Sequence, residues 1–345
     1  MKTVIKFLKE IEEGDNVIVI CHNDADGICS AVLLNKYLKS KDIDTDFIVQ
    51  PMPVDENLVG RLKSYFPKNI IIVDIAIDQQ LSLIKNLNKM ANVAVIDHHQ
   101  IENDLNKIGV VHYNPRFEDK NVYQSASYCT YKICSKLMDM KKWLWVTGVG
   151  MVADYALGDS KDLVKKLSQK YGTEELYETI LGTLTDIITY TKATRKVYLT
   201  KIIDIIDEME KPEDIYEIKE GKKMVEAYEI VKQEITNIIN EAKRDNKPDY
   251  LLHEMESDYN LRSPISTKLS EIFEGKFIGI YQKIGSKYKL SARNQSDDAN
   301  VAKILKKATR GLKASAGGHK NAAGATIDEK NWQEFKSKLI SILSK

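Results

Sequence analysis

The sequence predicts an α/β protein: an N-terminal doubly wound, mostly parallel sheet, a helical connector and a smaller C-terminal α/β domain. Short apolar runs alternate with amphipathic helical stretches in the first part of the chain, as in βαβ units. A charged helical stretch without a recognisable motif follows from about residue 161 to 243. A second alternation of strands and helices begins near Pro248. We therefore expect domain boundaries at 1–157, 158–247 and 248–345.

The N-terminal strands are predicted from continuous runs of β-branched residues, which are typical of parallel strands buried on both faces. These strands are expected at 16–21, 46–50, 69–74, 92–97 and 109–112. Apolar residues at helical spacing, such as Ile28, Val32 and Leu33, predict the intervening helices. The helices are expected at 3–13, 27–38, 56–65, 78–90, 125–138 and 143–156.

The connector and the C-terminal domain follow from the same patterns. The connector is amphipathic, as in Ile202 to Ile206, and we interpret it as a cap or lid. An arm for a partner protein is the alternative. In the C-terminal domain we expect strands at 250–255, 277–282 and 288–293, the last two forming a hairpin, and helices at 265–273 and 299–309. A turn at Gly317-Gly318, a further strand and a final helix complete it.

Composition restricts the class of protein. No apolar run approaches the length of a transmembrane helix, and the charged first residues do not resemble a signal peptide. The four cysteines form no CxxC pair, so we expect free thiols in a reducing cytoplasm. The net charge of +1 conceals an asymmetry: residues 261–345 carry 17 Lys/Arg and 7 Asp/Glu, a net of +10, and the remainder carries −9. The basic part could hold a polyanion or could simply be a lysine-rich surface.

Three predicted strands end in polar residues that can bind metal. The first leads into His22, Asp24 and Asp26, the second into Asp74, and the third into Asp97-His98-His99. The carboxyl ends of parallel strands share one edge of a sheet, so these side chains should gather there. A lone Asp at a strand end is usually a turn or helix-capping residue, but so many together would repel one another without a cation. Mixed Asp and His ligands suit Mn²⁺ or a similar divalent ion.

These residues, in this order, resemble the motif series of the DHH phosphoesterase superfamily. The series is His22-Asn23-Asp24-Ala25-Asp26-Gly27, then Asp74, then Asp97-His98-His99, then Asp154. The first motif is similar to the Asp-x-Asp-x-Asp-Gly form of RecJ-like nucleases, with His in the first place. Near the end of the chain, the segment from Gly317 to Gly324 resembles the signature of the DHH-associated C-terminal domain.

The resemblance implies a role for each site residue. His22 and Asp24 would bind one divalent ion, Asp26, His98 and Asp154 would bind the other, and Asp74 would bridge them. The ions would be Mn²⁺, with Mg²⁺ or Co²⁺ as alternatives. Asp97 would orient a histidine, and His99 would face the scissile phosphate or the leaving group. The substrate-binding residues would be Arg293, Gly317, Gly318 and His319. Arg116, beside a strand end, is a further candidate for a phosphate contact.

The resemblance also implies a function. We expect a Mn²⁺-dependent phosphodiesterase that hydrolyses single-stranded DNA or RNA, or short oligonucleotides, to nucleoside monophosphates, with water activated by two ions. Hydrolysis of a cyclic dinucleotide or nucleoside bisphosphate is one alternative, and the dependence on substrate length separates the two. A catalytically inactive replication or repair scaffold is another, and such relatives typically lose metal ligands. A replication or repair protein is an expected partner, and a membrane is not.

Overall fold

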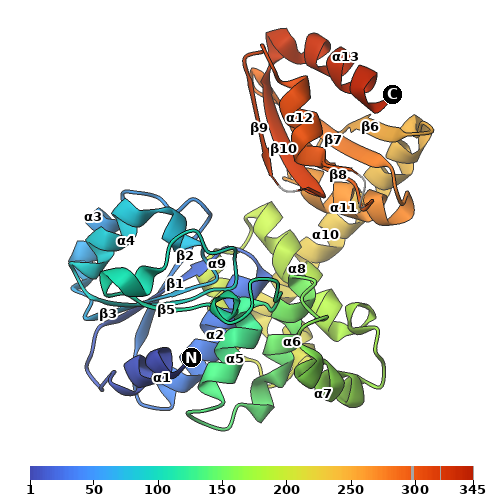
Figure 1. Cartoon of the computed structure of the whole chain (residues 1–345). Helices are drawn as coiled ribbons and strands as arrows, with labels where there is room; N and C mark the ends of the chain where they lie inside the picture. Colours follow the sequence, from blue (N-terminus) through green and yellow to red (C-terminus); the bar gives the residue numbers. More distant parts are fainter. Residues whose placement is uncertain (297–298, 319, 345) are drawn as a thin grey trace. The chain divides into compact units, whose positions relative to one another are not determined.

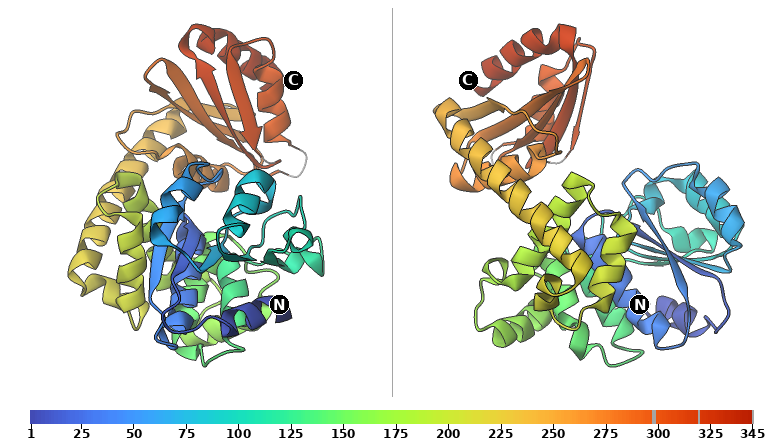
Figure 2. Two further views of the ribbon diagram at one scale, coloured as in Figure 1. Left: turned by 90° about the vertical axis from the view of Figure 1, so that its left-hand side faces the viewer. Right: turned by 180° about the vertical axis from the view of Figure 1, so that it is seen from behind.

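The computed structural model describes residues 1–296, 299–318 and 320–344 and divides the chain into two compact units, Met1–Tyr228 and Glu229–Lys345 (Figure 1). The first unit contains residues 158–228 of the predicted connector, together with the whole of the predicted metal domain. The chain passes from one unit to the other within a single long helix, α10 (Lys219–Ala242), which is seen best in the right-hand view of Figure 2. The predicted boundaries at 157 and 247 stay predictions.

The first unit contains a wholly parallel sheet in the order β2-β1-β3-β4-β5, which confirms the doubly wound prediction. Its strands are β1 (Val17–His22), β2 (Thr45–Gln50), β3 (Asn69–Val73), β4 (Asn92–Ile96) and β5 (Val111–Tyr113). In the strand order, the chain moves from β1 outward to β2 in one direction, and from β3 through β4 to β5 in the opposite direction. The reversal point therefore lies between the carboxyl ends of β1 and β3, where ligands of such sheets bind.

Side chains along each strand point alternately to the two faces of this sheet, and helices cover both faces (Figure 1). Ile18, Ile70 and Val93 point to one face, where they form a core with α3 (Leu58–Leu62) and α4 (Leu81–Asn88). On the other face lie helices α1 (Lys2–Lys9), α2 (Ala25–Lys39) and α5 (Ala126–Cys134). Residues 27–38 were predicted to be amphipathic, but α2 is buried on nearly all sides, since α5, α6 and α9 also pack on it.

The predicted connector is a set of helices packed onto this unit. They are α7 (Lys161–Tyr171), α8 (Ile180–Thr194) and α9 (Leu199–Glu208), and they follow α6 (Leu144–Ala153) of the predicted metal domain. Ion pairs from Lys36 and Lys39 of α2 to the buried Asp207 attach α9, with N–O distances of 2.9 and 2.5 Å. Short 3₁₀ turns link the elements of the chain: Lys63–Tyr65, Ile77–Gln79, Leu105–Ile108, Pro115–Phe117, Lys141–Trp143, Leu176–Glu178, Pro212–Tyr216, Lys243–Asp245 and Glu329–Asn331.

The second unit has a mixed sheet in the order β6-β7-β8-β10-β9, in which β6 and β7 are parallel and the other neighbours are antiparallel. The strands are β6 (Tyr250–Glu254), β7 (Phe277–Ile284), β8 (Lys287–Arg293), β9 (Ala314–Gly318) and β10 (Ala322–Asp328). Helices α12 (Val301–Ala308) and α13 (Trp332–Leu343) share a core with one face, and α11 (Arg262–Ile272) contacts β7 and β8.

One local prediction in this unit is wrong. Gly317 and Gly318 were expected to form a turn, but they end strand β9, which pairs with β10. The run from Ala314 to Gly318 holds only small residues with little strand preference, so its conformation depends on its neighbour. Gly318 has a φ of 136°, and a Cβ there would lie 2.5 Å from the Cα of Ala323, so only glycine fits.

Two expectations drawn from composition can be examined directly. Across residues 1–296, 299–318 and 320–344, no helix combines the length and apolar content that a membrane crossing requires. Cys21, Cys29, Cys129 and Cys134 are all free and buried.

Candidate metal centre

The polar residues predicted at the strand ends gather at the reversal point of the first sheet. His22 ends β1, Asp74 follows β3, His98 and His99 follow β4, and Asp154 follows α6. Their ligand atoms form three groups within which every pair of atoms lies within 4.8 Å. The groups are His22, Asp24 and Asp74; Asp26, His98 and Asp154; and Asp74, His98 and His99. The first group joins Asp74 to His22 and Asp24, and the second group is the other ligand set that the family resemblance implies. The third group places Asp74 beside His98, which belongs to that second set.

The first group is built by the loop between β1 and α2. Asp24 caps α2, because its Oδ1 accepts the backbone N–H of Gly27 at 3.0 Å. Its Oδ2 lies 2.5 Å from His22 Nδ1, which lies 3.7 Å from Asp74 Oδ2. A Cβ on Gly27 would lie 2.5 Å from the carbonyl oxygen of His22, so this glycine lets α2 begin directly against β1. The capping interpretation of a strand-end Asp is correct for Asp24, which also contributes to the group.

Asp26 is completely buried and is held by another helix. Its carboxylate accepts the backbone N–H groups of Ala126 at 2.7 Å and Ser127 at 3.0 Å, in the first turn of α5. The amino end of a helix favours such an anion. A Cβ on Gly150 of α6 would collide with the side chains of Asp26 and Ser127. This glycine therefore gives α6 room to pass beside the carboxylate.

Asp74 lies between the two groups. His98 Nε2 is 3.1 Å from Asp74 Oδ1 and 3.2 Å from Asp154 Oδ2. Asp74 is 2% exposed, and neither of its oxygens accepts a hydrogen bond from the described residues. Its φ of 60° is in the left-handed region, which an aspartate adopts at some cost. A buried carboxylate without hydrogen bonds is unfavourable unless a cation compensates it, so this residue fits a metal ligand.

The electrostatics of the group also fit divalent cations. Burial and the charges of neighbouring carboxylates raise the pKa values of Asp74 and Asp154. Burial and Asp24 raise the pKa of Asp26 to about 7, although hydrogen bonds from Ser127 and Ala126 oppose the shift. Burial lowers the pKa of His98 to about 4, so its imidazole is neutral and available to a metal. The carboxyl groups therefore tend to hold protons, and binding of divalent cations would displace these protons.

Asp97 and His99 form a separate pair beside these groups. Asp97 is 2% exposed, and its Oδ1 lies 2.7 Å from His99 Nδ1. The backbone N–H of His99 donates to the other oxygen at 3.3 Å. Burial opposes protonation of His99, but its hydrogen bond to Asp97 and the negative charges of Asp97 and the nearby carboxylates together outweigh burial and raise its pKa. The pair thus has the geometry that the predicted orienting role of Asp97 requires.

Comparison with protein families decides the identity of the first unit. The family described as "DHH family, N-terminal domain" matches residues 16–158, and the DHHA1 domain matches residues 257–345. The chain belongs to the DHH phosphoesterase superfamily. The family predicted from the motifs is confirmed. No curated protein matches the chain in sequence.

Solved structures with this fold include proteins named as nucleases and as a phosphodiesterase. RecJ in complex with Mn²⁺ from Thermus thermophilus superposes with a TM-score of 0.77 at 15% identity, over 99% of this chain and 54% of that one. An exonuclease RecJ bound to manganese gives 0.72 at 16% identity, over 100% and 94%. A pGpG-specific phosphodiesterase from Vibrio cholerae gives 0.57 at 16% identity, over 95% and 98%. The chain thus spans about half the length of the first of these proteins.

The predicted substrate residues of the DHHA1 domain lie at one end of its sheet. Arg293 ends β8, pairs with Ala322 of β10 and donates from Nη2 to Ser263 Oγ at 3.2 Å. Gly318 pairs with Ala323 of the same strand, and Gly317 is exposed. Arg293 and the two glycines therefore lie at the same end of the sheet. The predicted substrate residue His319 lies outside the described residues.

Arg116, predicted to contact phosphate, is 9% exposed and already has partners. Its Nε donates to the carbonyl of His98 at 2.8 Å, and its Nη1 donates to the carbonyl of Lys120 at 2.8 Å. It therefore positions the backbone of the DHH motif, and its phosphate contact stays a prediction.

Sequence reasoning missed two residues near the DHH motifs. Tyr123 donates from its hydroxyl to the carbonyl of Asp154 at 3.0 Å, and its ring centroid lies 5.8 Å from that of His98. Lys192, at the end of α8, donates to Oδ1 of Asn23 at 2.6 Å. Tyr123 is close in sequence to Arg116, but nothing else distinguishes it. Lys192 lies in the helical stretch without motifs, so no pattern pointed to it.

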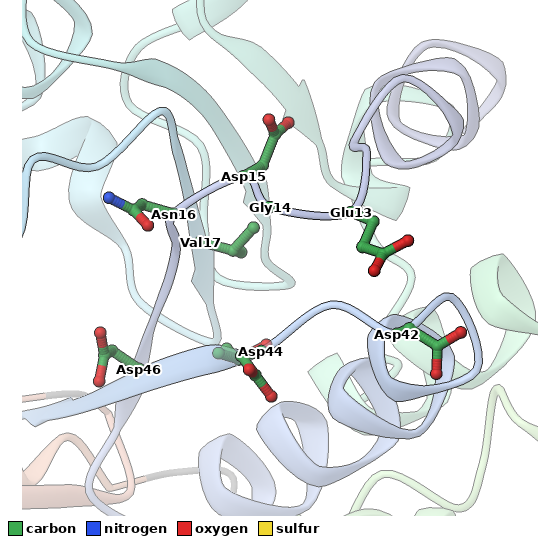
Figure 3. A pocket seen from close by; sticks show the side chains of 9 residues that line it. Glu13, Gly14, Asp15, Asn16, Val17, Asp42, Asp44 and Asp46 are labelled. Carbon is green, nitrogen blue, oxygen red and sulfur yellow. The ribbon is translucent and has the colours of Figure 1, made fainter.

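An acidic hollow of about 560 Å³ lies elsewhere in the same unit, at the amino ends of β1 and β2. Figure 3 shows the side chains of Glu13, Asp15, Asp42, Asp44 and Asp46 around it. The DHH motifs are at the opposite ends of these strands, so the hollow is separate from the candidate metal centre. One of the carboxylates that line the hollow, Asp15, forms an ion pair with Lys68, with 2.7 Å between Oδ1 and Nζ.

Proposed function

We propose that the protein is a two-metal phosphodiesterase that hydrolyses single-stranded DNA or RNA, or short oligonucleotides, to nucleoside monophosphates. The observation that carries this proposal is the position of Asp74. Its buried carboxylate shares one group of ligand atoms with His22 and Asp24, and its Oδ1 lies 3.1 Å from Nε2 of His98, which belongs to the second set. It accepts no hydrogen bond from the described residues and is held at a φ of 60°. A carboxylate in this arrangement is suited to bridge two cations.

The donor atoms support Mn²⁺ as the cofactor. Each of the two sets combines one imidazole with two carboxylates, a mixture that suits Mn²⁺ better than Mg²⁺, which prefers oxygen alone. When bound, two such ions lower the pKa of a water molecule and offset charge on the phosphoryl group. The RecJ structures with Mn²⁺ are in accord with this assignment.

The side chains beside the centre would handle the proton and the leaving group. His99 carries a raised pKa because Asp97 stabilises its protonated form. We assign His99 as the acid that protonates the leaving oxygen, and Asp97 as the residue that fixes its orientation. Asp97 leaves His99 Nε2 free of this pairing, since the contact is made by Nδ1.

The second unit would hold the nucleic acid strand. Residues 261–345 carry a net charge of +10, which favours a polyanion. At the end of its sheet, Arg293 can pair with a phosphate, and Gly317 and Gly318 allow a strand to approach the backbone closely. We assign them, with His319, to strand binding.

A small nucleotide is the second candidate substrate. It is favoured by the fold shared with the pGpG-specific phosphodiesterase, of which the chain covers 98%. An inactive scaffold is disfavoured, because a metal-binding residue is present at every predicted position and these residues gather in the structure.

The deciding experiment is product mapping on end-labelled DNA and RNA of several lengths, with Mn²⁺ and with chelator. We expect mononucleotides from single strands, with activity lost in chelator and restored best by Mn²⁺. Cleavage of dinucleotides alone would favour the second candidate. Full activity in the presence of chelator would contradict the two-metal proposal.

A further inference from the structure

Lys192 is a partly buried lysine of the first unit whose hydrogen-bond partner is a neutral group. Of the other partly buried lysines, Lys36 and Lys132 pair with the carboxylates of Asp207 and Asp162, and Lys41 donates to the backbone carbonyls of Lys9 and Ile11. The ammonium of Lys192 instead donates to the neutral amide oxygen of Asn23, and no carboxylate of the described residues forms an ion pair with it. Its positive charge is therefore not neutralised by a neighbouring side chain.

The contact places this charge next to the candidate metal centre. Asn23 is the residue between His22 and Asp24, which belong to the same ligand set. The charge of Asp24 also acts on Lys192, although burial is the larger influence and lowers the pKa of Lys192. A lysine that only stabilised the end of α8 would not need to reach this loop.

The helix that carries Lys192 is firmly attached to α6, which leads into Asp154. A Cβ on Gly148 of α6 would lie 2.9 Å from a methyl group of Leu181, so the two helices pack closely. Thr185 Oγ1 donates to the carbonyl of Val149 at 3.0 Å. Lys192 follows Thr185 by two helical turns and shares its face of α8. Its position relative to the centre is therefore fixed by packing.

The charge balance of the centre indicates what Lys192 would bind. Asp24, Asp26, Asp74 and Asp154 together would offset the charge of two divalent ions. A phosphodiester entering such a centre could bind the ions directly but would meet no net positive charge, so a further cation would strengthen its attraction. The ammonium of Lys192, which has no carboxylate partner, can supply that attraction at one edge of the site.

We propose that Lys192 and the Asn23 loop form a phosphate subsite that holds a backbone phosphate of the bound strand beside the metal centre. This inference rests on the proposed function and extends it to a residue of the helical region. The ammonium donates to a phosphate oxygen, and Asn23 holds the ammonium in place before the substrate arrives.

The test compares Lys192→Gln with Lys192→Arg. Glutamine keeps a donor for Asn23 and removes the charge, while arginine keeps the charge. Lys165→Gln, at an exposed lysine of α7, is the matched control. Binding of a labelled oligothymidylate is followed by fluorescence anisotropy over a range of salt concentrations, with Ca²⁺ as the divalent ion. Mn²⁺ binding by calorimetry and the melting temperature are measured on the same proteins.

Loss of one phosphate contact lowers the slope of log K against log salt concentration by about 0.7 for a single strand. We expect this change, and about 10-fold weaker binding, for Lys192→Gln. Lys192→Arg and Lys165→Gln should keep the wild-type slope, and all variants should bind Mn²⁺ as the wild type does. An unchanged slope in Lys192→Gln overturns the subsite, as does loss of Mn²⁺ binding with the slope preserved.

The two proposals fail in different ways. If the wild-type protein neither binds nor cleaves oligonucleotides, both the proposed function and the subsite are wrong. If it cleaves them and Lys192→Gln keeps the wild-type slope, only the subsite is wrong.

Discussion

The two regions predicted from motifs, the metal centre of the first unit and the strand-binding edge of the second, are built in different ways. Asp26, Asp74 and His98 are buried, and neighbouring elements hold Asp26 through backbone N–H groups. Gly317 and Gly318 are exposed, and Arg293 contacts a serine hydroxyl. Groups that bind ions need fixed positions and shielding from water, whereas groups that hold a long, flexible ligand need access. Substitutions should therefore affect chemistry in the first region and binding in the second.

The largest effect is expected from Asp74→Asn. Because Asp74 belongs to the group of His22 and lies 3.1 Å from His98 of the other set, its loss should weaken both ions and reduce kcat by more than about 10³-fold. Asp78→Asn is the control, since Asp78 is equally buried at 2% exposure but accepts backbone N–H groups of Glu102 and Asn103. It should keep both ions. Calorimetry with Mn²⁺ and steady-state kinetics measure the two outcomes, and two bound ions in Asp74→Asn would contradict a bridging role.

The next largest effect is expected from His99→Ala. If His99 is the acid, kcat should fall by about 10²–10⁴-fold while the ions remain bound. His112→Ala is the control, because His112 is a buried histidine of β5 that packs on Phe117, with ring centroids 5.0 Å apart. It should affect stability more than kcat. A rise in KM alone for His99→Ala would show that His99 binds substrate and does not transfer the proton.

A smaller effect is expected in the second unit. Arg293→Ala should raise KM on oligonucleotides by about 10-fold, the usual value of one charge-assisted hydrogen bond, and leave kcat nearly unchanged. Arg310→Ala removes an equal charge from an exposed position of the same unit and should have less effect. Kinetics on one defined oligonucleotide distinguish them. Equal changes in both variants would mean that only the overall charge matters.

The smallest effect concerns the metal-free protein. Burial and neighbouring carboxylates raise the pKa of Asp74, so the folded state binds more protons than the unfolded chain. Its contribution to stability is therefore lost as the pH rises above about 4, the ordinary pKa of a carboxyl group. The raised pKa of Asp26 has the same effect on stability, and its contribution is lost as the pH rises toward its pKa of about 7. In chelator, Asp74→Asn should lose less stability than the wild type between these pH values.

Thermal unfolding in chelator across this pH range tests the last prediction. A difference of 1 kcal/mol corresponds to about 2–4 °C for a unit of this size. Asp78→Asn should melt below the wild type throughout, because two backbone N–H groups lose a charged acceptor. The structure indicates that the carboxylates repel one another. An identical pH dependence of the melting temperature in Asp74→Asn and wild type would contradict this.

The sequence by itself determined the fold class and the family. Continuous β-branched apolar runs such as Val93–Ile96 are typical of strands in a sheet covered on both faces, and polar residues directly after parallel strands meet at one edge of the sheet. The parallel sheet and the DHH assignment are confirmed for this reason. The roles of the individual ligands stay predictions, although the structure brings His22, Asp24, Asp26, Asp74, His98 and Asp154 into the expected groups.

The tertiary structure alone decided features that depend on distant partners. The strand at Ala314–Gly318 exists because β10 pairs with it, although its own residues favour no strand. Asp26 is held by the amino end of α5, about a hundred residues away in sequence, and Lys192 reaches Asn23 from a helix without a motif. Local patterns record which face of an element is buried. They do not record which remote donor meets a given carboxylate, because that contact arises only when the helices pack.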